Sequence, residues 1–161
     1  MSALFAATYP EHVSHLILCG GFSRGADLRP KGPTPVQLED QLAQRVKNWG
    51  NGDMLKAVLP SHAQGPNAVA MLARMERLCS TPGGIKTMLL LISQIDVTSV
   101  LPTIQVPTLV LHRVSDIVVP VEFGRQLAAQ IPGARYIEYP EGDHGFWTGD
   151  TETLVGTLRN S

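Results

Sequence analysis

Several features that would narrow the class of this protein are missing from its sequence. Only two cysteines occur, Cys19 and Cys79, which are too few for a disulfide scaffold or a zinc site. The formal net charge is -1 and the basic residues are scattered, so we expect no nucleic-acid partner. Purely apolar runs such as Met88–Ile92 are far too short to span a bilayer. No signal-peptide pattern follows Met1, so a cytoplasmic protein without membrane contact is the expectation.

The two cysteines stand in apolar surroundings. Cys19 closes a run with strand character, and Cys79 lies near the end of an expected helix. We therefore expect both to be buried free thiols. The histidines include no pair at helical spacing with a third ligand, so neither a metal nor another cofactor is expected.

A strand, a helix and a second strand follow one another in the last third of the chain. Thr108–His112 is rich in β-branched residues and leucine, which is typical of a strand covered on both faces. Val121–Ile131 carries apolar residues at four-residue spacing after Pro120, which predicts a helix. Arg135–Tyr139 has the pattern of a short strand. This order predicts a right-handed crossover between parallel strands.

Two polar residues follow these two strands. Asp116 lies in the loop after the first strand, and His144 lies in the loop after the second. Because sites in parallel sheets form beyond the carboxyl ends of the strands, the two side chains are candidates for one site. A carboxylate can hold a histidine base in one tautomer and stabilise its cation. The alternatives are a plain loop role for Asp116 and a surface-loop role for His144, and the order and spacing favour the paired site.

The amino-terminal residues add a helix and another strand. Met1–Tyr9 is rich in small residues and predicts the last turns of a helix that ends at Pro10. Val13–Cys19 has the apolar character of a strand, and Gly20 and Gly21 follow it. The expected fold class is therefore α/β, with about three parallel strands and flanking helices.

These two ends of the chain resemble the α/β-hydrolase family. The first helix, its Y-P-E-H-V turn and the next strand are similar to the helix after the nucleophile and the sixth strand of that family. The resemblance implies that Asp116 is the triad acid after the seventh strand and that His144, in G-D-H, is the triad base after the eighth. It implies hydrolysis of an ester or related bond in a small-molecule substrate, without a cofactor. It places a partial hydrolase core at residues 1–25 and 96–161.

The resemblance carries over no nucleophile and no oxyanion hole. In the family the nucleophile stands in a G-x-S-x-G turn before the helix with which this chain begins. The chain is therefore expected to be truncated, to match the back half of the fold and to be inactive or weak alone. One G-x-S-x-G match occurs at Gly21–Gly25, with Ser23 at its centre. No helix start follows it, so a strand-end loop role for Ser23 is favoured over a nucleophilic role.

Residues 26–95 begin with a linker rich in proline and glycine and continue with helical character. Thr34 and Pro35 predict one helix start, and Thr81 and Pro82 predict another. The α/β-hydrolase family inserts its cap between the sixth and seventh strands, so the resemblance implies a cap that covers the pocket and supplies substrate contacts. The apolar residues of these helices could line such a pocket, but packing between the helices is favoured for most of them.

A second hypothesis is a non-catalytic assembly or regulatory module. With the sixth strand of the family at the margin of the sheet, Val13–Cys19 would be an exposed edge, and exposed apolar edges are templates for pairing. Two copies could pair this strand antiparallel about a two-fold axis, which predicts a homodimer. The segments A-A-T-Y-P-E-H-V and V-P-T-L-V-L-H-R also resemble hydrolase-like domains fused to nucleotide cyclases, which implies part of a signalling protein.

Overall fold

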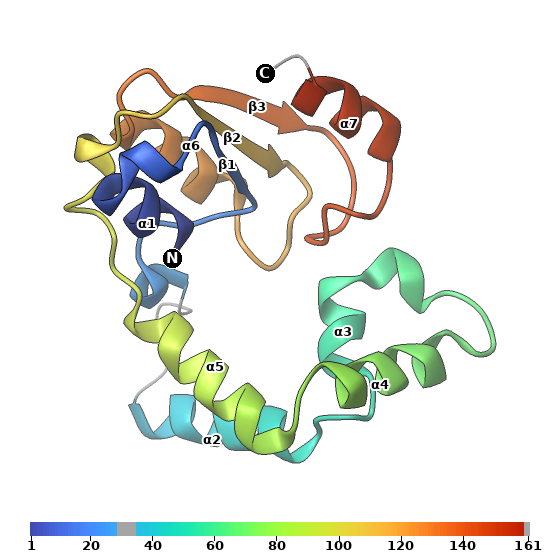
Figure 1. Ribbon diagram of the computed structural model, residues 1–161. Coiled ribbons are helices and arrows are strands. Elements are labelled where there is room, and N and C mark those ends of the chain that lie inside the picture. Colours follow the sequence, from blue (N-terminus) through green and yellow to red (C-terminus); the bar gives the residue numbers. More distant parts are fainter. Residues whose placement is uncertain (29–34, 160–161) are drawn as a thin grey trace. The chain divides into compact units, whose positions relative to one another are not determined.

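The computed structural model describes residues 1–28 and 35–159 and divides the chain into two compact units. The first unit combines Met1–Arg24 with Asp96–Ser161, and the second is Gly25–Ile95. The first unit holds a sheet with its helices (Figure 1). Its elements in chain order are α1 (Ser2–Thr8), the 3-10 helix η1 (Pro10–His12), β1 (Leu16–Cys19), the 3-10 helix η4 (Leu101–Thr103), β2 (Thr108–Arg113), α6 (Val121–Gln130), β3 (Arg135–Tyr139) and α7 (Thr151–Arg159).

The sheet has three parallel strands in the order β1-β2-β3. Leu16 pairs with Thr108 on one side of the central strand. Leu109 pairs with Arg135 on its other side. Every residue of β2 is buried, as its β-branched and leucine-rich pattern predicts, because β1, β3 and α6 pack against it. The predicted strand–helix–strand order of this part of the chain is confirmed, with bounds that differ by one residue at most.

The predicted strand Val13–Cys19 is wrong in its length, because β1 begins only at Leu16. The main-chain N–H of Leu16 donates to the carbonyl of Pro107 at 2.9 Å, directly before β2 begins. Residues 13–15 therefore have no partner in β2 and form neither strand nor helix. β1 lies at the edge of the sheet, and Ile17 on it is 43% exposed.

The helices of the first unit cover the sheet through small or branched apolar residues. α1 contacts β1, α6 contacts β2 and β3, and both helices also contact η4. Ala3 and Ala6 are the buried residues of α1, so this helix approaches β1 closely. α7 is joined to β3 by the hydroxyl of Tyr139, which donates to Oγ1 of Thr157 at 2.8 Å.

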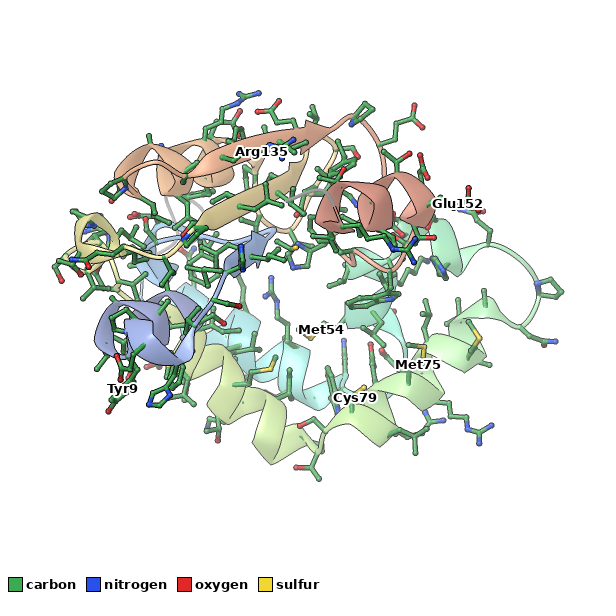
Figure 2. All side chains as sticks on the ribbon, turned by 45° about the horizontal axis from the view of Figure 1, so that its top comes forward. Tyr9, Met54, Met75, Cys79, Arg135 and Glu152 are labelled. Carbon is green, nitrogen blue, oxygen red and sulfur yellow. The ribbon has the colours of Figure 1, made fainter. Side chains whose placement is uncertain are left out.

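Every regular element that the structure describes in the second unit is a helix. In contact with one another are α3 and α4, α2 and α5, and α5 and η2. Figure 2 shows Met54 of α3 beside α4, which carries Met75 and Cys79. The elements are η2 (Gly25–Leu28), α2 (Pro35–Lys47), α3 (Asp53–Val58), the 3-10 helix η3 (Pro60–Ala63), α4 (Ala68–Cys79) and α5 (Pro82–Gln94).

The expected helix start at Thr81 is confirmed, since its Oγ1 accepts the N–H of Gly84 at 3.1 Å. The other expected cap, Thr34, lies outside the described residues. Leu72 and Ile85 are buried, but Met71 is 50% and Leu91 is 59% exposed. Packing within the unit therefore accounts for only part of its apolar side chains.

A buried carboxylate joins α3 to α4. The side chain of Glu76 accepts the main-chain N–H groups of Gly50 and Gly52 at 2.8 and 2.9 Å on one oxygen. Its other oxygen accepts the N–H of Leu55 at 2.9 Å. The carboxylate thereby satisfies N–H groups at the start of α3, which has no capping side chain of its own.

The expectation that both cysteines are buried is wrong, because Cys19 and Cys79 are exposed. Cys19 ends the edge strand β1, and Cys79 is the last residue of α4. Neither position could be assigned to the surface before the strand order and the helix packing were known. No helix within the described residues has the length and apolar character needed to cross a membrane.

Candidate active site

The structure brings Asp116 and His144 into direct contact. Nδ1 of His144 lies 2.7 Å from Oδ2 of Asp116. Asp116 follows β2 and His144 follows β3, so the parallel register places both loops at the same end of the sheet. The Asp116 side chain is fully buried, and the His144 side chain is 30% exposed. The Asp116 carboxylate is thus shielded from water, while the His144 ring is partly open to it.

The Asp116 carboxylate is held by the turn that leads into α6. Its Oδ1 accepts the main-chain N–H groups of Val118 and Val119 at 2.8 and 2.9 Å. Burial raises the pKa of Asp116, but the hydrogen bonds from His144, Val119 and Val118 together hold that pKa below its ordinary value. The acid is therefore ionised at neutral pH. Since an ionised carboxylate only accepts, Nδ1 of His144 carries the hydrogen, and its Nε2 is free to take a proton.

A second histidine supports the acid without joining the pair. His112 is fully buried near the end of β2, and its Nε2 donates to the carbonyl of Val119 at 2.8 Å. The same Nε2 lies 3.6 Å from Oδ2 of Asp116, which is too far for a hydrogen bond. The ring packs against Gly124 of α6, where a Cβ atom would lie 2.3 Å from Nδ1. His112 thus fixes the turn that holds Asp116.

The end of β1 lies against the base. Gly20 has a φ of +57°, a backbone conformation that residues with a side chain rarely adopt. A Cβ atom at Gly20 would lie 3.2 Å from Cε1 of His144 and 3.4 Å from the ring of Phe146. A glycine after β1 therefore leaves the space that the imidazole occupies.

Ser23 lies beyond the end of β1 and is buried, with 6% of its surface exposed. Its carbonyl accepts the N–H of Val97 at 2.9 Å, and the 3-10 helix η2 follows it. Ser23 does not have a positive φ, and within the described residues no hydrogen bond joins it to His144. This backbone differs from the strained turn and helix that support a nucleophile in a G-x-S-x-G elbow, so the strand-end reading stays favoured.

The loops around the pair expose apolar side chains. Ile117, next to the acid, is 69% exposed, and Trp147, shortly after the base, is 70% exposed. Val114, at the start of the acid loop, is 47% exposed. Both loops of the pair therefore present apolar side chains to solvent.

The sequence reasoning missed Arg113, which closes β2 and is only 3% exposed. Its guanidinium donates to the carbonyl oxygens of Glu141, Phe146 and Thr148 in the loop that carries His144. The signal in the sequence was a charged residue at the end of an otherwise apolar buried strand. Its partners could not be found without the fold.

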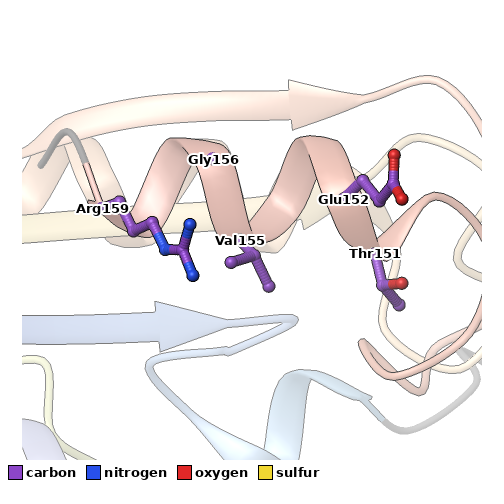
Figure 3. A pocket seen from close by; sticks show the side chains of 5 residues that line it. All are labelled: Thr151, Glu152, Val155, Gly156 and Arg159. Atoms are coloured by element: carbon purple, nitrogen blue, oxygen red, sulfur yellow. The ribbon is translucent and has the colours of Figure 1, made fainter.

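A shallow hollow lies elsewhere on the first unit, on the surface of α7. Figure 3 shows Thr151, Val155 and Arg159 pointing from the same side of this helix. Glu152 and Gly156 complete its lining, so the hollow includes none of Asp116, His144 and Ser23. Glu152 is exposed in the first turn of the helix (Figure 2).

Comparison with known proteins yields no matching family model. A bifunctional esterase/perhydrolase from Acinetobacter calcoaceticus is 41% identical to the chain over 63 residues. That alignment covers 38% of this chain and 23% of the relative. The sequence similarity is therefore local.

Solved structures match nearly the whole chain. The enol-lactonase from Burkholderia xenovorans LB400 matches 99% of it with a TM-score of 0.76 at 21% identity. An esterase from Exiguobacterium antarcticum matches 98% with a TM-score of 0.70 at 23% identity. An alpha/beta hydrolase enzyme from a Medee basin deep-sea metagenome library matches 98% with a TM-score of 0.76 at 17% identity.

The chain spans about three fifths of these solved relatives, with 60%, 62% and 59% of their lengths covered. At these identities the likeness concerns the fold and not the reaction. The parallel sheet, its flanking helices and the helical unit between β1 and β2 match over that span, and the chain therefore has the α/β-hydrolase fold.

Proposed function

We propose that this chain supplies the acid and the base of an α/β-hydrolase active site that cleaves carboxylic esters or lactones. The observation that carries the proposal is the 2.7 Å contact between Nδ1 of the exposed His144 and the buried, ionised Asp116. Such a pair has the tautomer and the orientation that a general base needs. The names of the solved relatives, an enol-lactonase and an esterase, support this choice of substrate class.

In the proposed reaction His144 takes the proton of a nucleophilic hydroxyl through Nε2 while that oxygen attacks the substrate carbonyl. Asp116 stabilises the imidazolium that forms. His144 then returns the proton to the leaving alkoxide, and in the second half it activates the water that hydrolyses the acyl intermediate. The exposed apolar side chains of Ile117 and Trp147 suit a small substrate with an apolar group. No cofactor takes part, and the helical unit of residues 26–95 acts as the cap.

The nucleophile is the part of the mechanism that no residue of the chain fills well. We assign Ser23 to the strand-end loop, so the chain alone is a weak or inactive hydrolase. Labelling with a fluorophosphonate followed by peptide mapping tests this assignment. No labelled serine is expected; a label on Ser23 would mean that a rearranged triad exists in this chain.

The role of the pair is tested by hydrolysis of p-nitrophenyl acetate, which an imidazole base can promote without a serine. We expect His144→Ala and Asp116→Asn each to lower the rate by about tenfold or more, because the carboxylate acts only through that histidine. His15→Ala is the matched control, since His15 is exposed and lies outside the pair. Equal rates for the four proteins would refute the proposed base.

The second candidate is the assembly or regulatory module, and the exposed edge of the sheet favours it. β1 has no partner on its outer side among the described residues, and Ile17 and Cys19 on it are exposed. Antiparallel pairing of two copies about a two-fold axis would cover this edge and join both sheets. The resemblance to domains fused to nucleotide cyclases suits such a role in a signalling protein.

Light scattering after size-exclusion chromatography tests this candidate. The module predicts a dimer at micromolar concentration that Ile17→Lys converts to a monomer. Val36→Lys is a control, since Val36 is exposed on α2 and is not part of the strand. A monomer in all three samples would exclude pairing through β1.

A further inference from the structure

β2 ends on an arginine that is buried although it carries a permanent charge. Arg113 is 3% exposed, and its guanidinium donates to three main-chain carbonyl oxygens. Nη1 donates to Glu141, and Nη2 donates to Thr148 and, at 3.5 Å, to Phe146. A buried charge is tolerated only where hydrogen bonds replace those it would make to water. The three carbonyls provide these hydrogen bonds, and the guanidinium in turn satisfies the carbonyls.

The three carbonyls lie on both sides of His144 in the chain. The segment between β3 and α7 has no helix or strand, and within it the N–H and hydroxyl of Thr148 donate to the carbonyl of Gly145 at 3.0 and 2.7 Å. A hydrogen bond from the Ser115 hydroxyl to the carbonyl of Gly142, at 2.9 Å, is a further tie to the acid loop. The guanidinium therefore joins the central strand to this loop before and after His144.

The loop is shaped to leave room for the guanidinium. Gly142 has a φ of +120°, and a Cβ atom there would lie 1.9 Å from Nη1 of Arg113. A Cβ atom at Gly149 would lie 3.1 Å from the same nitrogen. The ring of Phe146 lies against the guanidinium, with its centroid 5.3 Å from Cζ. Residues on both sides of His144 in the sequence thus pack around the guanidinium of Arg113.

We propose that Arg113 is a positioning residue that holds His144 in register with Asp116. The flat guanidinium places three donors at fixed angles, and each fixes one point of the loop. With the loop in place, Nδ1 of His144 meets Asp116 and Nε2 points away from it. This inference rests on the proposed base role of His144, although the contact that it explains exists without any substrate.

The test reads the tautomer of His144 in the folded protein by nitrogen-15 NMR. The full chain is expected to show the Nδ1–H form. In Arg113→Met we expect the ratio of Nδ1–H to Nε2–H to fall by about tenfold or more, because the charge-assisted bond to Asp116 is lost. Arg113→Lys restores the ratio only in part, since one ammonium cannot reach three carbonyls. Arg125→Met is the control, because Arg125 is half-exposed and pairs with Glu138 away from the loop.

A second variant keeps Arg113 and leaves the net charge of the protein unchanged. Gly142→Ala places a methyl group on Nη1, and we expect it to lower the same ratio. Gly65→Ala is its control, since Gly65 has a φ of +99°, also outside the left-handed helical region, and nothing lies within 4 Å of its Cβ position. Backbone strain alone affects both variants, whereas displacement of the guanidinium affects only the first.

The outcomes separate this inference from the proposed function. An unchanged tautomer in folded Arg113→Met and Gly142→Ala would overturn the positioning role, whatever the effect on the free energy of unfolding. If Arg113→Met does not fold, the result for Gly142→Ala decides. If the tautomer shifts but His144→Ala leaves ester hydrolysis unchanged, the positioning role stands and the proposed base role fails.

Discussion

Replacing Glu76 by glutamine tests how the second unit is held together. The carboxylate has no exposed surface and accepts three main-chain N–H groups, from Gly50, Gly52 and Leu55. Glutamine has nearly the same shape but only one oxygen. That oxygen can accept from both glycines, and the amide nitrogen then faces the N–H of Leu55. The substitution therefore removes one acceptor and weakens two charge-assisted bonds.

The size of the effect follows from these bonds. A hydrogen bond to a charged group contributes about 1.5–3 kcal/mol, and a neutral one about 1 kcal/mol. Losing one charged bond and converting two others costs about 3–5 kcal/mol, and relief from burying a charge offsets part of this. We expect the free energy of unfolding to fall by about 3 kcal/mol. At a slope of about 1–2 kcal/mol per M, the urea midpoint moves down by about 1.5–3 M.

The assay uses the fluorescence of Trp49 during urea unfolding. The indole nitrogen of Trp49 donates to the carbonyl of Ser80 at 2.8 Å, so its emission reports on the second unit. Trp147, which is 70% exposed, is replaced by phenylalanine in all samples to remove its signal. Glu39→Gln, at an exposed position of α2, is the matched control and should stay within about 0.5 kcal/mol.

A loss below about 0.5 kcal/mol for Glu76→Gln would refute the reasoning. It would mean that water replaces the carboxylate at the three N–H groups with little cost. A large loss in Glu39→Gln as well would point to net charge, and not to the buried bonds, as the cause.

Three further predictions concern the acid and its support. In Asp116→Asn the amide should face Nδ1 of His144 and reverse its tautomer, which nitrogen-15 NMR detects; an unchanged tautomer would contradict the assigned hydrogen bond. Because the pKa of Asp116 is lowered in the folded protein, its stabilisation is complete above the unfolded value of 3.8 and is lost as pH falls through the folded value. The pH dependence of unfolding should therefore be weaker in Asp116→Asn, and parallel curves would refute the shift. Gly124→Ala should lower the free energy of unfolding by about 1–3 kcal/mol, because its Cβ would clash with His112. Gly156→Ala is the control: its Cβ would meet open space, and it should raise the free energy of unfolding by about 0.5–1 kcal/mol. Equal melting temperatures for the two variants would argue against the clash.

Much of the carboxyl-terminal part could be predicted because its signals are local. The apolar run of β2, the spacing of apolar residues in α6 and the short strand β3 each follow from neighbouring residues. Asp116 and His144 could be placed near one another because parallel strands bring their carboxyl ends together. Their separation of 2.7 Å is a tertiary result, as it depends on how two loops fold back.

The start of β1 and the exposure of the cysteines could not be predicted, because both depend on a neighbour. β1 can begin only at Leu16, where β2 begins to provide a partner. The sequence pattern that predicted the strand already begins at Val13. The residues next to Cys19 in the sequence are apolar and would be the same whether or not another strand covered Cys19.

The sequence by itself determined the α/β class, the order of the elements and the placement of Asp116 and His144 after neighbouring strands, since all of these rest on short-range patterns and on the geometry of parallel strands. Only the tertiary structure decided which carbonyls Arg113 binds, which N–H groups Glu76 satisfies and which ring atom Gly124 leaves room for. These contacts join segments that are distant in the chain, and buried polar groups take whatever partners the packing brings to them. No local pattern encodes that choice.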